Sequence, residues 1–316
     1  MTGAGRGADP LTPAAYAALL DPAYRAAAAA LPAEDLDWAT ADPAVLRAAY
    51  DASHAVFADD AAAVAVSGWP DAAGSGGLAF RPEGAPAGVA VLYFHGGGWI
   101  VGSPQSHRVA VSHLAAGAGI PVVSARYRLA PEHPYPAQVE DAVAAVARLA
   151  PDAERLVLAG DSAGAALAFW TWDALAPDLQ ARIAGIVGIY GAYGLGDSAS
   201  RRRFGPVCPG LSDRDIAAYR AHLGLETWTG TGAAFDTLER QMAEGPPVFL
   251  AGAALDPVLD DTTAMAARLE ALGRPVEAVT AEALPHGFIH FVGRVPAAAA
   301  VLAQAAAWIR TRLIPA

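Results

Sequence analysis

The chain has 316 residues and a formal net charge of −11, with 21 basic residues, all of them arginine, against 32 acidic ones. This length is enough for one large domain with a substantial core, and the acidic balance excludes the broad basic surface of a nucleic-acid-binding protein. The single cysteine, Cys208, excludes an internal disulfide, and no apolar run reaches transmembrane length, so we expect no membrane span and a cytoplasmic location.

The first sixty residues are rich in alanine and contain no good strand pattern. Helices are predicted over 13–20 and 43–57. Asp42 is expected to cap the second of them, because it precedes a proline at the first helical position. We expect residues 1–60 to form an N-terminal helical lid segment.

From residue 61 onward, strand patterns alternate with helix patterns, which predicts a mostly parallel sheet covered on both faces. Strands are expected over 61–69, 78–81, 89–94, 121–126, 155–159, 183–190, 247–251 and 275–280, and helices over 108–118, 139–149, 163–175, 261–272 and 296–313. Between 191 and 245 this rhythm breaks, with short helical patterns such as 216–223 and no good strand. We therefore predict one domain over 61–316 that carries a lid insertion at about 191–245.

The pentapeptide from Gly160 to Gly164, with Ser162 at its centre, lies between a predicted strand and a predicted helix. A serine on such a sharp turn needs small residues two positions away on each side, and the two glycines meet that need. The turn also aims the N-terminus of the following helix at the serine, where it favours developing negative charge. The pattern indicates a nucleophilic serine, with a plain turn and a chance match as the alternative.

A second motif, His95 to Trp99, contains three consecutive glycines and directly follows a predicted strand. Glycines allow backbone N–H groups to approach a ligand without obstruction by side chains. Such a loop can donate hydrogen bonds to the oxyanion of a tetrahedral intermediate, together with the N–H of Ala163. A phosphate-binding loop is the weaker alternative, because no lysine follows and the GxGxxG spacing is absent. His95 itself is expected to orient the loop.

Together with the run from Tyr127 to Ala137, these motifs resemble the hormone-sensitive-lipase branch of the α/β-hydrolases, and most of all its bacterial esterases. The resemblance implies the α/β-hydrolase fold, with a mostly parallel central sheet, helices on both faces and a helical lid. It also implies a serine carboxylester hydrolase that cleaves short-chain acyl esters through an acyl-enzyme. In this family the second and third glycines of the loop donate to the oxyanion, which here implies Gly97 and Gly98 with Ala163.

The partners of the nucleophile should follow it in the order acid, then histidine. Asp256 precedes a proline, as the family's acid does, whereas Asp260 and Asp261 fit the cap and first turn of the next helix. His286 precedes Gly-Phe, as the family's histidine does, and His290 is the alternative, which we expect to line the pocket or pack. The predicted catalytic triad is therefore the serine with Asp256 and His286.

Aromatic residues beside these motifs are the candidates for the substrate pocket, namely Trp99, Tyr190, Tyr193 and Phe288. Aromatic residues on the helix after the nucleophile, by contrast, are expected to be core, as is usual at helical spacing; these are Phe169, Trp170 and Trp172.

No cofactor and no metal are expected, because the remaining histidines show no metal-site spacing; these are His54, His107, His113, His133 and His222. The expected partner is a small-molecule ester, without nucleic acid or membrane, and the resemblance leaves open a homodimer through a sheet edge. Two alternative functions share the fold. One is an amidase or formamidase with the same triad, and the other is a non-catalytic small-molecule receptor. Receptors that resemble this family have lost the catalytic histidine, whereas His286 is present here.

Overall fold

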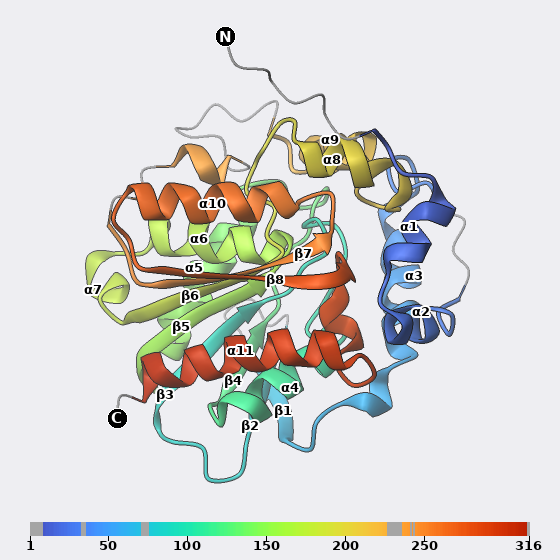
Figure 1. Ribbon diagram of the computed structural model, residues 1–316. Helices are drawn as coiled ribbons and strands as arrows, with labels where there is room; N and C mark the ends of the chain where they lie inside the picture. Colours follow the sequence, from blue (N-terminus) through green and yellow to red (C-terminus); the bar gives the residue numbers. More distant parts are fainter. Residues whose placement is uncertain are drawn as a thin grey trace.

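The computed structural model describes residues 9–32, 36–70, 76–225, 236–240, 242 and 244–314. Its centre is an eight-stranded sheet in the order β1-β2-β4-β3-β5-β6-β7-β8 (Figure 1). The strands are β1 (Ala65–Trp69), β2 (Gly77–Arg81), β3 (Gly88–Phe94), β4 (Val122–Ala125), β5 (Ala153–Asp161), β6 (Ile183–Ile189), β7 (Val248–Leu255) and β8 (Val276–Pro285). β2 pairs antiparallel with both β1 and β4, and the other pairings are parallel, as the strand-helix alternation predicts.

Helices cover both faces of this sheet (Figure 1). One face carries α4 (Arg108–Ala118) and α11 (Pro296–Leu313), and the other carries α5 (Ala137–Leu149), α6 (Ala163–Ala174) and α10 (Leu259–Ala271). Successive residues of a central strand therefore enter two different cores: Val157 packs on the α4 side and Leu158 on the α6 side. This explains why the central strands are continuous apolar runs.

The two segments predicted as lids lie together beyond one end of the sheet (Figure 1). The N-terminal segment forms α1 (Pro13–Leu19), α2 (Pro22–Ala28) and α3 (Pro43–Ala55), and the later one forms α8 (Ala199–Phe204) and α9 (Asp213–His222). They contact each other where the ring of Tyr16 packs on that of Phe204. The parts of these segments at 1–8, 33–35, 226–235, 241 and 243 are outside the described residues. That the two segments act as a lid stays a prediction.

Helix α3 is fastened to the main domain by two of its residues. Leu46 is fully buried against Ile100 and Val101. Arg47 donates from Nε to the carbonyl of Ile100 at 2.8 Å and from a terminal nitrogen to the carbonyl of Ala130 at 2.8 Å. Its guanidinium also makes a two-pronged contact with the Glu132 carboxylate, at 2.8 and 2.7 Å. The N-terminal segment is therefore bound directly to the backbone that follows the glycine loop.

Several element boundaries differ from the sequence-based expectation. β7 and β8 run four and five residues further than predicted, because they pair with each other as far as Leu255 and Pro285. Helix α2 was not predicted, although Asp21 before Pro22 is the same capping signal as Asp42, which accepts from the N–H of Ala44 as expected. Within the described residues, no helix combines the length and apolar character that crossing a bilayer requires.

Candidate active site

Ser162 stands on the turn between β5 and α6, with φ 52° and ψ −119°. This positive-φ geometry is tolerated because the positions two residues away on each side are glycine. A Cβ on Gly164 would lie 2.0 Å from the carbonyl oxygen of Phe94, and one on Gly160 would lie 2.4 Å from that of Gly164. The Ser162 side chain makes no capping hydrogen bond to α6. The N–H of Ala163 is one of those that a helix start leaves without an internal partner, and Ala163 lines the same cavity as Ser162.

His286 and Asp256 reach the serine from the ends of β8 and β7. The Nε2 atom of His286 lies 2.9 Å from the hydroxyl oxygen of Ser162, and its Nδ1 lies 2.7 Å from Oδ2 of Asp256. Asp256 is fully buried, and its other oxygen accepts from the N–H of Val258 at 2.8 Å. The carboxylate is thus held in one orientation, with one oxygen on the backbone and the other on the imidazole.

The glycine loop after β3 has an unusual backbone. Gly97, Gly98 and Trp99 all have positive φ, at 109°, 58° and 62°. At Gly97 a side chain is excluded by space as well, because a Cβ there would lie 2.4 Å from the carbonyl oxygen of Val101. Gly97 and Gly98 line the same cavity as Ser162. That their N–H groups stabilise an oxyanion together with that of Ala163 stays a prediction.

His95 belongs to the support of this loop. Its Nδ1 lies 2.8 Å from the carbonyl oxygen of Gly96, and its ring stacks on that of Tyr127 with centroids 4.2 Å apart. The Tyr127 hydroxyl donates in turn to the carbonyl of His95 at 2.8 Å. Burial lowers the pKa of His95 to about 3, so the ring is neutral at physiological pH. These contacts are those expected of a residue that orients the glycine loop.

A cavity of about 470 Å³ opens above the serine. Much of its wall is apolar and comes from the two segments predicted as lids, as shown by Tyr24, Leu31, Trp38, Phe57, Val207 and Ile216. Of the residues predicted to bind substrate, Trp99 and Tyr190 line this cavity, and the ring of Tyr190 lies 4.5 Å from that of His286, centroid to centroid.

The other two predicted pocket residues are placed in the core. Phe288 is fully buried and packs edge-on against Tyr190, behind the cavity wall. Tyr193 is also fully buried, because its ring fills the space beside Gly188 and Gly191: a Cβ on either would lie within 2.2 Å of it. In the sequence, the glycines close to Tyr193 are the signal that could have indicated its burial, because they leave space for the ring. Phe169 and Trp170 are core residues, as expected for the helix after the nucleophile.

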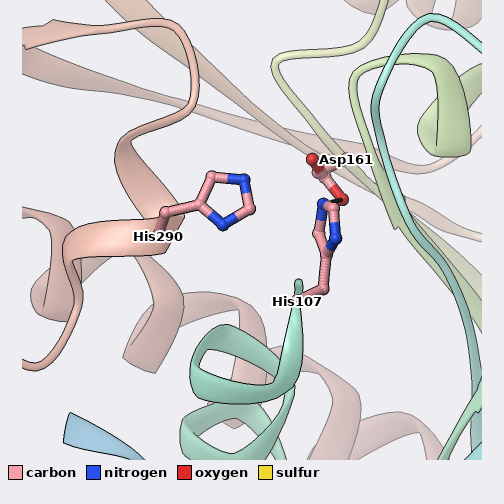
Figure 2. A group of neighbouring side chains, drawn as sticks. All are labelled: His107, Asp161 and His290. Carbon is pink, nitrogen blue, oxygen red and sulfur yellow. Dashed lines mark ion pairs between the residues drawn. The ribbon is translucent and has the colours of Figure 1, made fainter. Parts of the chain in front are cut away.

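Behind the nucleophile lies a polar cluster that no local sequence pattern indicates. His107 caps α4, Asp161 ends β5 and His290 lies in the 3₁₀ turn Phe288–Phe291, and Figure 2 shows the three side chains converging. Asp161 accepts from the Tyr93 hydroxyl at 2.7 Å and from the N–H of Gly96 at 2.9 Å. His107 Nε2 lies 3.3 Å from the same carboxylate. The residue before the nucleophile is therefore bound to the first glycine of the loop.

Comparison with known proteins identifies the family of this chain. The profile of a family described as having the alpha/beta hydrolase fold matches residues 91–290. The chain is similar to esterase LipI of Mycobacterium tuberculosis, with 35% identity over 236 residues, covering 69% of this chain and 70% of the relative.

Two solved structures are similar over nearly their whole length. EstE1, a thermophilic carboxylesterase cloned from a metagenomic library, is 29% identical with a TM-score of 0.78, covering 89% of this chain and 100% of that one. An esterase from the bacterial hormone-sensitive lipase family is 25% identical with a TM-score of 0.78, covering 93% and 99%. The chain belongs to the α/β-hydrolase family, in its hormone-sensitive-lipase branch of esterases.

Proposed function

We propose that this protein hydrolyses short-chain carboxylic esters of small or aromatic alcohols, with Ser162 as the nucleophile. The observation that carries the proposal is the continuous chain of contacts from the serine hydroxyl to His286 Nε2 at 2.9 Å and from His286 Nδ1 to Asp256 at 2.7 Å. A nucleophile with a positioned base, itself oriented by a buried acid, is the arrangement needed for acyl transfer.

The reaction starts when His286 takes the proton from Ser162 as its oxygen attacks the ester carbonyl. Asp256 holds the proton on Nδ1, so that Nε2 is free to accept, and it stabilises the imidazolium that forms. The negative charge on the carbonyl oxygen is met by the N–H groups of Gly97, Gly98 and Ala163, each of which contributes about 3–4 kcal/mol of barrier lowering in comparable sites. His286 then protonates the leaving alcohol, and a water molecule activated by the same imidazole releases the acid from Ser162.

The cavity supports a small, largely apolar substrate. Its volume of about 470 Å³ lies in the ordinary range for small-molecule pockets, and its aromatic and aliphatic walls favour an uncharged acyl or alcohol group. Cytoplasmic location and a homodimer through a sheet edge belong to this proposal as well; the single thiol, Cys208, is consistent with a reducing compartment.

The test is a side-by-side panel of p-nitrophenyl acetate, p-nitrophenyl butyrate and the matching anilides, with wild type and the Ser162→Ala variant. We expect ester hydrolysis by wild type, its loss in Ser162→Ala, and an unchanged rate in Ser67→Ala, a serine exposed on β1. An organophosphonate should add one adduct at Ser162. Folded wild-type protein that leaves both esters intact would refute the proposal, and faster cleavage of the anilides would replace it by an amidase.

A further inference from the structure

The cluster behind the nucleophile has the composition of a metal site. His107, Asp161 and His290 each offer one ligand atom, and these atoms all lie within 4.8 Å of one another. All three residues are buried, with 0%, 2% and 8% of their surface exposed. Figure 2 shows that they come from three separate elements, with the His107 ring beside the Asp161 carboxylate and the His290 ring turned toward this pair. Imidazole and carboxylate ligands together suit zinc and its neighbours in the first transition row.

The position of His107 suits a ligand. Its Nδ1 lies 3.0 Å from the Ser106 hydroxyl and 3.3 Å from the carbonyl oxygen of Ser103, so the ring proton has acceptors on that side. Nε2 then faces Oδ1 of Asp161 at 3.3 Å. Two ligands on a tetrahedral zinc ion, with bonds of about 2.0–2.1 Å, are separated by roughly 3.4 Å. Metal-binding histidines commonly have their second nitrogen fixed by a backbone carbonyl in this way.

A further imidazole stands beside this group. His54 has its Nδ1 2.6 Å from the carbonyl oxygen of Tyr50, which again directs the ring proton to the backbone and leaves Nε2 as an acceptor. Its ring centroid lies 3.9 Å from that of His290.

The charge of Asp161 and the position of the cluster at the cavity also favour the binding of a metal ion. Among the described residues, His107 is the only basic side chain within ion-pair distance of the buried carboxylate of Asp161. The Asp161 carboxylate is held by the Tyr93 hydroxyl and the N–H of Gly96, and its negative charge would attract a divalent cation. Asp161, His54 and His290 all line the cavity above Ser162, so an ion can enter from the substrate side.

We propose that His107, Asp161 and His290 bind one zinc-like divalent cation at the rear of the catalytic cavity, with the ring of His54 supporting that of His290. The N–H of Gly96 now lies 2.9 Å from Asp161 Oδ1 and 3.2 Å from His107 Nε2, so the ion would displace it from the imidazole and share the carboxylate with it. Because Gly96 begins the glycine loop, occupation of the site pulls on the donors that stabilise the oxyanion. This effect rests on the proposed esterase function: zinc bound here would inhibit hydrolysis from behind the nucleophile, without occupying the triad.

The test uses full-length protein stripped with EDTA and titrated with ZnCl₂ by calorimetry, so that binding is measured independently of hydrolysis. We expect one equivalent to bind, and Co²⁺ at the same site to give the visible absorption of a tetrahedral ion. His290→Gln should weaken binding more than tenfold, since even loss of an outer-shell contact costs about 10–100-fold. His54→Gln should weaken it too, while His133→Gln, an exposed histidine, should not.

Hydrolysis of p-nitrophenyl acetate gives the second readout. The wild-type rate should fall in proportion to zinc occupancy. The His290→Gln variant should need at least ten times more zinc for half inhibition, when its rates are compared with its own rate without zinc. Two results would overturn the proposal: absence of stoichiometric binding by folded wild type, or unchanged binding in both His290→Gln and His54→Gln. Binding that disappears instead in His286→Gln would place the ion on the triad, and would likewise overturn it.

Discussion

Replacing Asp256 by asparagine tests the acid of the triad with little change in shape. One oxygen of Asp256 accepts from the N–H of Val258 at 2.8 Å, so the amide oxygen of an asparagine is held there. Its NH₂ group must then face Nδ1 of His286, where the carboxylate stood at 2.7 Å. Two donors cannot face each other, so the imidazole proton moves to Nε2, and the ring can no longer accept the proton of Ser162.

The size of the effect follows from these contacts. Rotating the asparagine amide by 180° would restore the working tautomer of His286, but its NH₂ group would then face the buried N–H of Val258. This unfavourable contact costs about 1–3 kcal/mol, which corresponds to a rate loss of roughly 10–100-fold. The neutral amide also no longer stabilises the imidazolium, and triads of this kind lose about 10⁴-fold in total. We expect kcat for p-nitrophenyl acetate to fall by that factor. KM should stay near its original value, because Asp256 is not among the residues that line the cavity.

The matched control is Asp260→Asn, since Asp260 is the neighbouring carboxylate, and its Oδ2 accepts from the N–H of Ser200 at 2.9 Å. We expect this variant to keep kcat within about twofold, because the Asp260 carboxylate bonds to the backbone of Ser200 and not to His286. Circular dichroism and thermal unfolding establish that both variants are folded. If Asp256→Asn retains more than a tenth of the wild-type kcat, or if Asp260→Asn loses as much, the assignment of the acid is wrong.

Three further predictions concern the glycine loop and its fastening to α3. Gly97→Ala should lower kcat by about 10²–10³-fold, the usual cost of losing one oxyanion donor, because its Cβ would meet the carbonyl of Val101. Arg47→Ala should lower the free energy of unfolding in urea by about 1–3 kcal/mol, because it removes three sets of hydrogen bonds. Glu132→Gln should cost at most about 1 kcal/mol at pH 7, because the pair is solvent-exposed. The Arg47 guanidinium lowers the pKa of Glu132 to about 2, so the difference from wild type should shrink as the pH falls from about 4.5 towards 2.

Each of these has its own control. Gly68→Ala places a methyl group in open space on β1 and should leave kcat unchanged. Arg25→Ala removes an exposed arginine of α2 and should leave the unfolding midpoint near that of wild type. An unchanged kcat in Gly97→Ala, equal midpoints for wild type and Arg47→Ala, or a Glu132→Gln difference that is constant with pH would each contradict the corresponding prediction.

The sequence predicts well those features that depend on one segment at a time. A strand buried on both faces must be apolar throughout, so β3, β5 and β6 are visible as runs. A nucleophile on a tight turn requires small neighbours, so Gly160 and Gly164 identify Ser162. The order of acid and histidine then selects Asp256 and His286, and the structure brings both to the serine.

Features that depend on several segments are not visible in this way. His54, His107 and His290 share no local spacing, because a helix of the N-terminal segment, the cap of α4 and the turn after β8 each supply one. The inward turn of Tyr193 depends on space left by two glycines in a neighbouring strand and turn. The full length of β8 depends on its pairing with β7, since its alternating pattern resembles a surface segment when seen alone.

The hydrogen bonds of Arg47 connect α3 to the backbone that follows the glycine loop. The same guanidinium holds the carbonyls of Ile100 and Ala130, and Ile100 is only two residues beyond Gly98. By thermodynamic reciprocity, anything that tightens the glycine loop must also tighten the docking of this helix, and release of the helix must loosen the loop. Amide exchange in α3 should therefore slow when a phosphonate occupies Ser162, although the two are far apart in the chain.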